Sequence, residues 1–328
     1  MMPGAAACSG PWVRRAIGAA VSVVSCPAHS ALPVPAFLSV LRRPLDAVLY
    51  SSTWLSLAAL GLMWATFLFW QVHIPARLGG LIFSATLFLY NLDSVLPYKQ
   101  GQHPGLSKRK QWMQRHRRAL LVVALVAGLV AGALFLLDAR LLRLTPFLLH
   151  LGLISVLYSM PLLKRQGRWW ALRDLPLLKV FLIAYVWAGV TVWIPALYLG
   201  RGLMEPVVWL LFLRRFLFIL ALAFVFDIRD YTKDRATGTR TFPGLFGIRA
   251  TKYIALLALL LAAVLVPPGT PAGQQAPLLL PLLAAAAVIW YAEETRPDYY
   301  FALLTDGVMV FQFVVVWWIT RGQAVSFS

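Results

Sequence analysis

The chain has 328 residues, of which 60% are hydrophobic and 13% are charged, and its formal net charge is +18. Soluble domains carry about a quarter charged residues, so this composition excludes an ordinary soluble protein. The positive charge does not indicate nucleic-acid binding, because nearly all Lys and Arg lie in short loops between apolar runs, which is where membrane proteins encode their topology. The two cysteines both precede the first long run and show no metal-binding spacing.

The amino-terminal segment, residues 1–44, precedes the first run of spanning length. We expect a disordered leader or an amphipathic helix at the membrane surface. Arg14, Arg15 and Cys26, around a short apolar stretch, also loosely resemble a lipoprotein signal. Cleavage there would place the new amino terminus outside, whereas the charges of the loops predict that it lies inside. A misassigned start codon is a further alternative.

Nine apolar runs of spanning length follow. In lipid, each run can satisfy its backbone hydrogen bonds only as a helix. The sequence therefore predicts an all-α, polytopic membrane protein, with nine transmembrane helices in one domain, residues 45–322, and a short extracytoplasmic tail, residues 323–328. The nine runs are 46–70, 78–97, 119–137, 141–161, 175–199, 207–227, 251–267, 277–292 and 299–320.

Basic residues gather in the connections after the second, fourth and sixth runs, whereas the alternate connections hold few. The positive-inside rule then places the amino terminus and the basic connections in the cytoplasm and the carboxyl terminus outside. An odd number of spans fits this pattern. We expect a multi-pass integral protein of the bacterial inner (cell) membrane.

Three acids mark the end of the sixth run. On a continuous helix Asp227, Asp230 and Asp234 fall within an arc of about 60°, while Arg229 and Lys233 share a neighbouring face. Clustered carboxylates repel one another and oppose the negative end of the helix dipole. A magnesium ion relieves both penalties and completes its coordination with water and phosphate oxygens. The alternative is a solvated helix end whose acids pair with nearby Arg and Lys.

The acidic pattern, followed by Gly238, Thr241-Phe-Pro243 and Gly247, resembles the second Asp-rich motif of the UbiA-type intramembrane prenyltransferases. The stretch Tyr158-Ser-Met-Pro161-Leu-Leu-Lys164 resembles that family's Tyr/Pro/Lys stretch, whose basic residue contacts the diphosphate. The resemblance implies a nine-helix bundle of the UbiA prenyltransferase type, with a cavity open to the membrane. It also implies Mg²⁺ on two Asp-rich motifs, binding the diphosphate of an isoprenoid donor.

The resemblance and the charge pattern together imply roles for individual residues. The predicted metal ligands and catalytic residues are Asp227, Asp230 and Asp234, with Lys164 as a further catalytic group. The predicted diphosphate-binding residues are Asn91, Asp93, Tyr158, Lys164, Arg229 and Lys233. Tyr90 and Tyr185 could present ring faces to an allylic cation, and Asp306 is an intramembrane charge, so these three are candidates for lining the cavity.

The first Asp-rich motif departs from the family pattern. At the end of the second run the family expects Asn-Asp-x-x-Asp-x-x-x-Asp, and with Asn91 aligned, Leu92 and Val95 replace two of the carboxylates. Asp93 points about 200° away from Asn91 on a regular helix. Both can line one site only if the chain bends, for which Pro97 provides a reason.

The sequence thus predicts Mg²⁺-dependent transfer of an isoprenoid group from a prenyl diphosphate to a lipophilic acceptor, an aromatic compound or a quinone or lipid precursor, within the membrane. The expected partners are the donor, the acceptor and membrane lipids, with no nucleic acid and no signal for an oligomeric state. The eroded first motif leaves a non-catalytic protein that binds a polyprenyl phosphate or lipid as the first alternative. A secondary transporter is the second, although transporter ion sites usually lie near the bilayer midplane.

Overall fold

The computed structural model describes residues 36–96, 107–160, 163–165, 168–172, 175–236, 238–267 and 270–321. The chain divides into two compact units, residues 1–41 and 42–328, and the account below concerns the second. The predictions for residues 1–35 and for the tail, 323–328, lie outside the described residues.

Every predicted apolar run forms helix. In chain order the elements are α1 (Ala36–Tyr50), α2 (Thr53–Phe69), α3 (Ala76–Val95), α4 (Lys108–Arg115), α5 (Arg117–Leu136), α6 (Ala139–Arg143), α7 (Thr145–Ser159), β1 (Leu163–Arg165), β2 (Arg168–Trp170), α8 (Leu178–Ala188), the π-helix η3 (Gly189–Trp193), α9 (Ile194–Tyr198), α10 (Pro206–Arg229), α11 (Tyr231–Ala236), α12 (Phe242–Phe246), α13 (Ile248–Val264), α14 (Ala272–Gln275), the 3₁₀ turn η4 (Pro277–Leu279), α15 (Leu280–Trp290), the π-helix η5 (Tyr300–Thr305) and α16 (Asp306–Thr320).

Not all of these helices are long enough to cross a bilayer, which takes about 20 residues. Among the described residues, five helices are long and apolar enough by themselves, namely Ala76–Val95, Arg117–Leu136, Leu178–Tyr198, Pro206–Arg229 and Tyr300–Thr320. A sixth crossing results if Arg42–Tyr50 and Thr53–Phe69 count as one span bent by 62°. The chain is therefore a polytopic membrane protein with five or six candidate spans, and nine crossings stay a prediction.

The first predicted run is not one straight helix. It is divided at Ser52, whose backbone is left-handed with φ 61°. Side chains other than glycine rarely adopt this conformation, and here it turns α1 away from α2.

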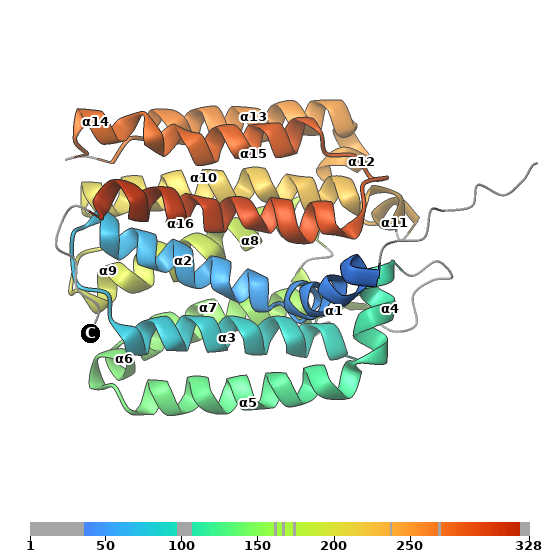
Figure 1. The fold of residues 1–328 in the computed structure, drawn as a ribbon, viewed down its shortest axis with the longest axis horizontal. Helices are drawn as coiled ribbons and strands as arrows, with labels where there is room; N and C mark the ends of the chain where they lie inside the picture. Colours follow the sequence, from blue (N-terminus) through green and yellow to red (C-terminus); the bar gives the residue numbers. More distant parts are fainter. Residues whose placement is uncertain are drawn as a thin grey trace, which may run out of the picture. The chain divides into compact units, whose positions relative to one another are not determined.

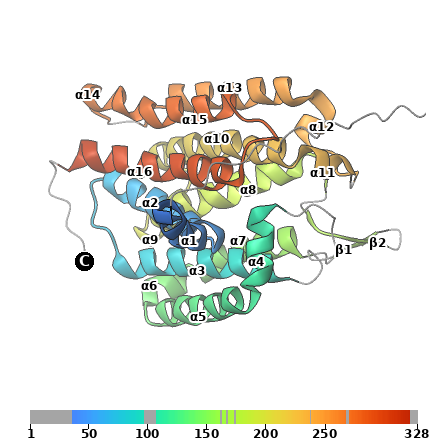
Figure 2. The same cartoon turned by 45° about the vertical axis from the view of Figure 1, so that its right-hand side comes forward.

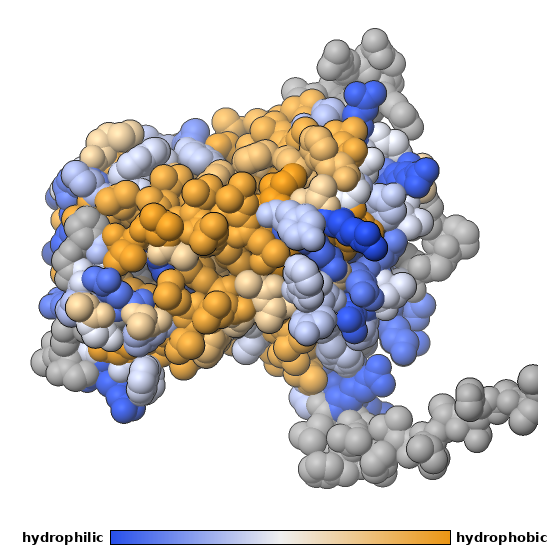
Figure 3. Space-filling view, turned by 90° about the horizontal axis from the view of Figure 1, so that it is seen from above, coloured by the Kyte–Doolittle hydropathy of each residue, from blue (hydrophilic) through white to orange (hydrophobic). Residues whose placement is uncertain are grey.

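The long helices run roughly side by side (Figure 1). The short helices α4, α11 and α12 lie at one end of the bundle and α6, α9 and α14 at the other. We call the first end the α4–α11 end. Figure 2 shows an antiparallel hairpin of β1 and β2 at this same end. It is the one piece of sheet among the residues that the structure describes. In Figure 3, apolar residues cover the middle of the visible face and hydrophilic ones gather toward its two ends, as a bilayer requires.

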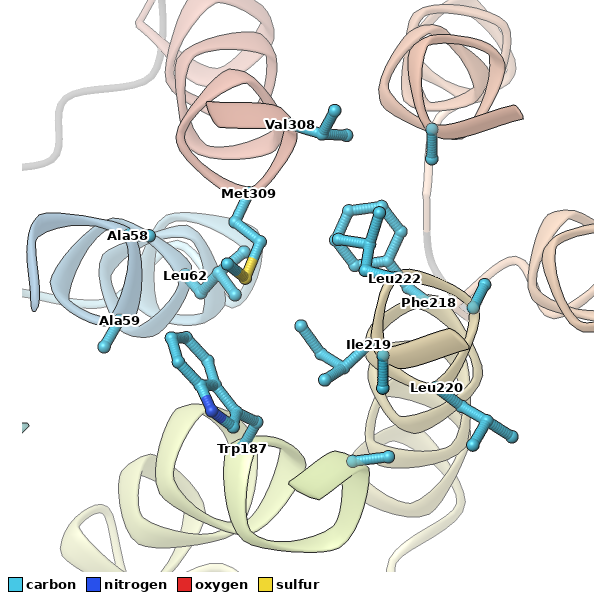
Figure 4. Close-up of a cluster of buried hydrophobic side chains, with 14 of the residues drawn as sticks. Ala58, Ala59, Leu62, Trp187, Phe218, Ile219, Leu220, Leu222, Val308 and Met309 are labelled. Carbon is cyan, nitrogen blue, oxygen red and sulfur yellow. The ribbon is translucent and has the colours of Figure 1, made fainter. Parts of the chain in front are cut away.

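The core lies where α2, α8, α10 and α16 meet (Figure 4). Leu62 of α2, Trp187 of α8, Ile219 of α10 and Met309 of α16 point into the space between the four helices, and each is less than a tenth exposed. Small residues allow close approach at the edge of this contact, because a Cβ atom on Gly61 would lie 3.1 Å from Phe313. The core fixes α8 and α10, the two helices that carry the site described next.

A buried arginine secures the far half of α10. Arg214 is 5% exposed, and its guanidinium group donates hydrogen bonds to the carbonyl oxygens of Ala262, Leu265 and Leu278. The first two belong to the carboxyl-terminal end of α13, where helix carbonyls have no partner within the helix. Arg214 of α10 thus caps α13 and also binds η4, the turn that leads into α15.

Arg214→Met should lower the free energy of unfolding by about 3 kcal/mol, because it leaves buried carbonyl groups without donors. Thermal denaturation of the purified protein in one detergent provides the measurement. Arg143→Met, a change at an exposed arginine of α6, is the matched control and should leave the melting temperature unchanged. Equal melting temperatures for the two variants would contradict this role of Arg214.

Candidate functional site

The acidic motif lies where α10 ends. Asp227 is in the last turn of α10 and is 2% exposed, Asp230 is the residue that ends the helix, and Asp234 lies in α11 and is 8% exposed. The predicted single helix face is therefore wrong, because the chain passes through a break at Asp230, with φ −91° and ψ 9°, before α11 begins. The three carboxylates therefore lie on α10, on α11 and at the break between them.

Lys179 is the partner of two of these acids. Its ammonium nitrogen lies 2.8 Å from Asp227 Oδ1 and 3.7 Å from Asp234 Oδ2, and its side chain is 18% exposed. Burial raises the pKa of Asp234, and the positive charge of Lys179 offsets part of that rise. Because a buried carboxylate is costly unless it is paired, this lysine is what allows both acids to lie at the edge of the core.

The third acid pairs with its neighbour in sequence. The Arg229 guanidinium donates to both carboxylate oxygens of Asp230, from Nε at 3.2 Å and from Nη2 at 2.9 Å. Burial opposes ionisation, but the Arg229 guanidinium, with help from Lys179 and Lys233, holds the pKa of Asp230 well below its usual range. The guanidinium carbon also lies 5.0 Å from the ring centre of Phe226 and 5.7 Å from that of Phe301.

Helix α4 brings further cations to the same place. The backbone N–H of Arg109 donates to Asp298 Oδ2 at 2.9 Å, while Nε of its side chain is buried without a hydrogen-bond partner among the described residues. The pKa of Arg109 is lowered, mainly by burial and secondly by the like charge of Arg229. The pKa of Lys110 is lowered in the same way, by burial and by the like charge of Lys233. Arg109 and Lys110 thus join Arg229, Lys233 and Lys179 as cations that interact electrostatically with Asp230. Such a gathering of cations is the charge pattern of a site for an anionic group.

An apolar cavity of about 690 Å³ lies within the bundle. Its walls come mainly from α3, α5, α7 and α8, with single residues of α2, η3 and α9, namely Ala59, Val190 and Ile194. Along α3 it extends from Leu81 to Leu96, about 22 Å at 1.5 Å per residue. Its lining is almost wholly aliphatic or aromatic, and two glycines, Gly132 and Gly152, face open space in it. Such a cavity fits a long apolar chain.

Polar side chains gather where the cavity approaches the α4–α11 end. Asp93, Tyr90 and Tyr158 all line it there. The Tyr90 hydroxyl accepts a hydrogen bond of 3.0 Å from Trp187 Nε1, and Lys179 interacts electrostatically with Tyr158. Through Tyr158, the lining of the cavity therefore interacts electrostatically with Lys179 of the charged cluster.

Asn91 and Asp93 point in different directions, as the helical spacing predicts. Asn91 is fully buried, and its Nδ2 donates at 2.8 Å to the carbonyl oxygens of Ser51 and Leu87. It secures the bend between α1 and α2, and it does not line the cavity. Asp93 is the residue of the reduced first motif that faces the cavity.

The remaining predicted residues are spread over the structure. Lys233 lies beside Lys110 in the cation cluster. Tyr185 lines a different region, where its hydroxyl is 2.9 Å from His150 Nε2. Asp306 is 8% exposed at the start of α16, directly after η5, and interacts with Arg109 and Arg229, outside the cavity lining. Lys164 is in β1, opposite Trp169, and its side chain lies outside the described residues.

The carboxylates do not present the arrangement that a metal ion needs. In the part of the chain that the structure describes, no three His, Cys, Asp or Glu side chains gather as a possible metal site. Asp227 and Asp234 converge on an ammonium group, and Asp230 on a guanidinium group. As the side chains stand, this donor set does not fit Mg²⁺, which requires close oxygen ligands in octahedral geometry.

One functional candidate, Lys179, escaped the sequence analysis. It stands alone near the start of an otherwise apolar run, and this was a usable signal, because an ionised residue inside an apolar run must find a partner. The basic loop after the second run offers Arg109 and Lys110 as residues that could neutralise a phosphate, but nothing in the sequence separates them from topogenic charges.

Residues 110–298, more than half of the chain, match the UbiA prenyltransferase family. A solved structure, described as digeranylgeranylglyceryl phosphate synthase in membranes, is 15% identical, covers 84% of this chain and 98% of its own, and has a TM-score of 0.48. That likeness is too weak to carry an argument. None of the curated proteins matches. On the family match, this chain belongs to the UbiA prenyltransferase family.

Proposed function

We propose that the protein transfers an isoprenoid group from a prenyl diphosphate to a lipophilic acceptor, an aromatic compound or a quinone or lipid precursor, inside the membrane. The observation that carries this proposal is the apolar cavity that ends beside a cluster of cations and carboxylates. A prenyl diphosphate has the same two parts, a long apolar chain and a compact anionic head. Family membership supports the same reaction class.

The head of the donor would bind at the cation cluster. Arg109, Arg229, Lys110 and Lys233 supply positive charge around Asp230, and Asp230 holds Arg229 in a fixed bidentate pair. The predicted roles of Lys164, Asp227 and Asp234 in diphosphate binding and catalysis remain part of the proposal. Fixed cations stabilise the charge that develops on the leaving diphosphate, which makes cleavage of the allylic C–O bond easier.

The chain of the donor would lie in the cavity between α3, α5, α7 and α8. When the C–O bond breaks, the diphosphate keeps the electron pair and an allylic cation remains. The rings of Tyr90, Tyr158 and Trp187 line that part of the cavity and can stabilise the cation. The acceptor then bonds to the allylic carbon and releases a proton, and the apolar walls keep water from competing.

The distribution of basic residues supports one orientation of the protein in the membrane. The α4–α11 end carries the basic connections after the second, fourth and sixth apolar runs, so we place it in the cytoplasm, with nine crossings, a cytoplasmic amino terminus and an extracytoplasmic carboxyl terminus. A water-soluble diphosphate head would then be reached from the cytoplasm, while the chain and the acceptor arrive through the bilayer.

A non-catalytic binder of a polyprenyl phosphate is the second candidate. It is favoured by one observation, that Asp93 is the single carboxylate which the first motif places on the cavity. Binding of a prenyl diphosphate without its cleavage would identify this function.

Arg229→Met should lower diphosphate release by about a hundredfold, because it removes a fixed cation from the leaving group. The assay uses protein in lipid nanodiscs with geranyl, farnesyl and geranylgeranyl diphosphates, a mixture of aromatic and lipid acceptors, and Mg²⁺. Arg296→Met is the control, because Arg296 is an exposed arginine at the same end and should not affect release. The proposal would be refuted if the unaltered protein neither bound nor cleaved any of the donors.

Gly152→Phe should act on chain length. A Cβ atom at Gly152 would meet nothing within 4 Å, so the new ring would project into the open middle of the cavity. We expect use of geranylgeranyl diphosphate to fall by about tenfold or more relative to geranyl diphosphate. Gly273→Phe, at an exposed glycine of α14 that also faces open space, is the control. An equal loss with both donors would show that the chain lies elsewhere.

A further inference from the structure

Lys179 lies at the centre of the second acidic motif. It bridges Asp227 on α10 and Asp234 on α11, at 2.8 Å and 3.7 Å, from the first turn of a third helix, α8. Asp230 adds to the electrostatic environment of the same ammonium group. All three acids of the motif therefore act on one side chain of the protein.

The backbone around Lys179 holds it in this position. Leu177, which precedes α8, has a left-handed conformation with φ 61°, and such strain persists only where the surroundings enforce it. Its N–H donates at 3.2 Å to the carbonyl oxygen of Arg240, in the loop that follows α11. This hydrogen bond ties the start of α8 to the chain that leaves Asp234. The lysine is thus part of the fold at this point.

An ammonium group and a divalent ion cannot share this position. Mg²⁺ binds carboxylate oxygens at about 2.0–2.1 Å in a near-octahedral arrangement, whereas the ammonium nitrogen already lies 2.8 Å from Asp227 Oδ1. A metal ion held by both acids would have to displace Lys179, which would then lie partly buried beside a doubly charged ion. Separating a buried ion pair is costly, because each charge is left without its partner.

The partners of the residues in both acidic motifs also argue against a bound metal ion. Asn91 donates to two backbone carbonyls, and Asp93 is the acid of the reduced first motif that lines the cavity. With Asp227 and Asp234 bound to Lys179 and Asp230 bound to Arg229, each acid of the second motif already has a cationic partner within the protein.

We infer that Lys179 is the resident cation of the acidic motif, and that its ammonium group, in the place of a metal ion, neutralises Asp227 and Asp234. The inference rests on the proposed function for the identity of the site as the diphosphate site. The binding of an ion to this site is nevertheless measurable without any substrate, so the two claims fail separately.

The test is Mn²⁺ binding, followed by electron paramagnetic resonance on the full chain in nanodiscs without substrate. The unaltered protein should show no saturable Mn²⁺ site that depends on Asp227. Lys179→Met should gain one site, with binding at least about tenfold tighter than in the unaltered protein, because Asp227 and Asp234 then lose the ammonium group that bridges them. Mn²⁺ should also raise the melting temperature of Lys179→Met but not of the unaltered protein.

Three controls complete the experiment. Lys179→Arg keeps the cation and should gain no site. Lys252→Met removes a half-buried lysine that donates to the Trp290 carbonyl and should also gain none. Adding Asp227→Asn to Lys179→Met should abolish the gained site.

Saturable Mn²⁺ binding to the unaltered protein that disappears in Asp227→Asn would overturn the inference, whether or not Lys179→Met folds. A correctly folded Lys179→Met variant that gains no site would overturn it as well. Absence of prenyl transfer, by contrast, would count against the proposed function and leave the ion-binding result as it stands.

Discussion

The site depends on one electrostatic constraint, the pairing of buried carboxylates at the end of a membrane helix. Asp227 is almost completely buried, and Lys179 compensates it at 2.8 Å. Because the cation comes from α8 and the acids from α10 and α11, their pairing joins three helices at the α4–α11 end. Trp187 is on the same α8, and it reaches both the core and the hydroxyl of Tyr90 in the cavity. The pairing therefore also sets the position of one cavity wall.

Irregular backbone places the polar groups around this pairing. The break between α10 and α11 lies at Asp230, whose carboxylate pairs with Arg229. The π-helix η5 precedes Asp306, and the bend at Ser52 gives Asn91 a carbonyl oxygen to bind. Such departures from regular helix are common at functional sites, and non-helical backbone at membrane depth requires protein or water around it.

Much of the fold was predictable from the sequence, because lipid allows few solutions. The nine apolar runs all form helix, and the acidic motif lies at the end of the helix where it was expected. The lengths of the crossings were less predictable. The runs at 141–161 and 277–292 form short apolar helices, Thr145–Ser159 and Pro277–Trp290. The break at Ser52 depends on tertiary packing, which hydropathy does not encode.

The partners of the acids were not predictable, because pairing joins residues far apart in sequence. Asp227 and Lys179 are on different helices, and nothing in the local pattern near Asp227 indicates the lysine. Helical spacing did predict that Asn91 and Asp93 diverge, but only the structure shows which of them faces the cavity. The hairpin of β1 and β2 was not predicted, since its strands are only three residues each.

The central claim is that the cavity and the charged cluster form one site for a prenyl diphosphate. A cryo-electron microscopy structure of the protein in nanodiscs with farnesyl thiodiphosphate, a slowly reacting donor analogue, tests it most directly. The account predicts density for the farnesyl chain between α3, α5, α7 and α8, and for the thiodiphosphate between Asp93 and Arg229. A chain bound on any other surface of the bundle, with the cavity empty, would contradict it.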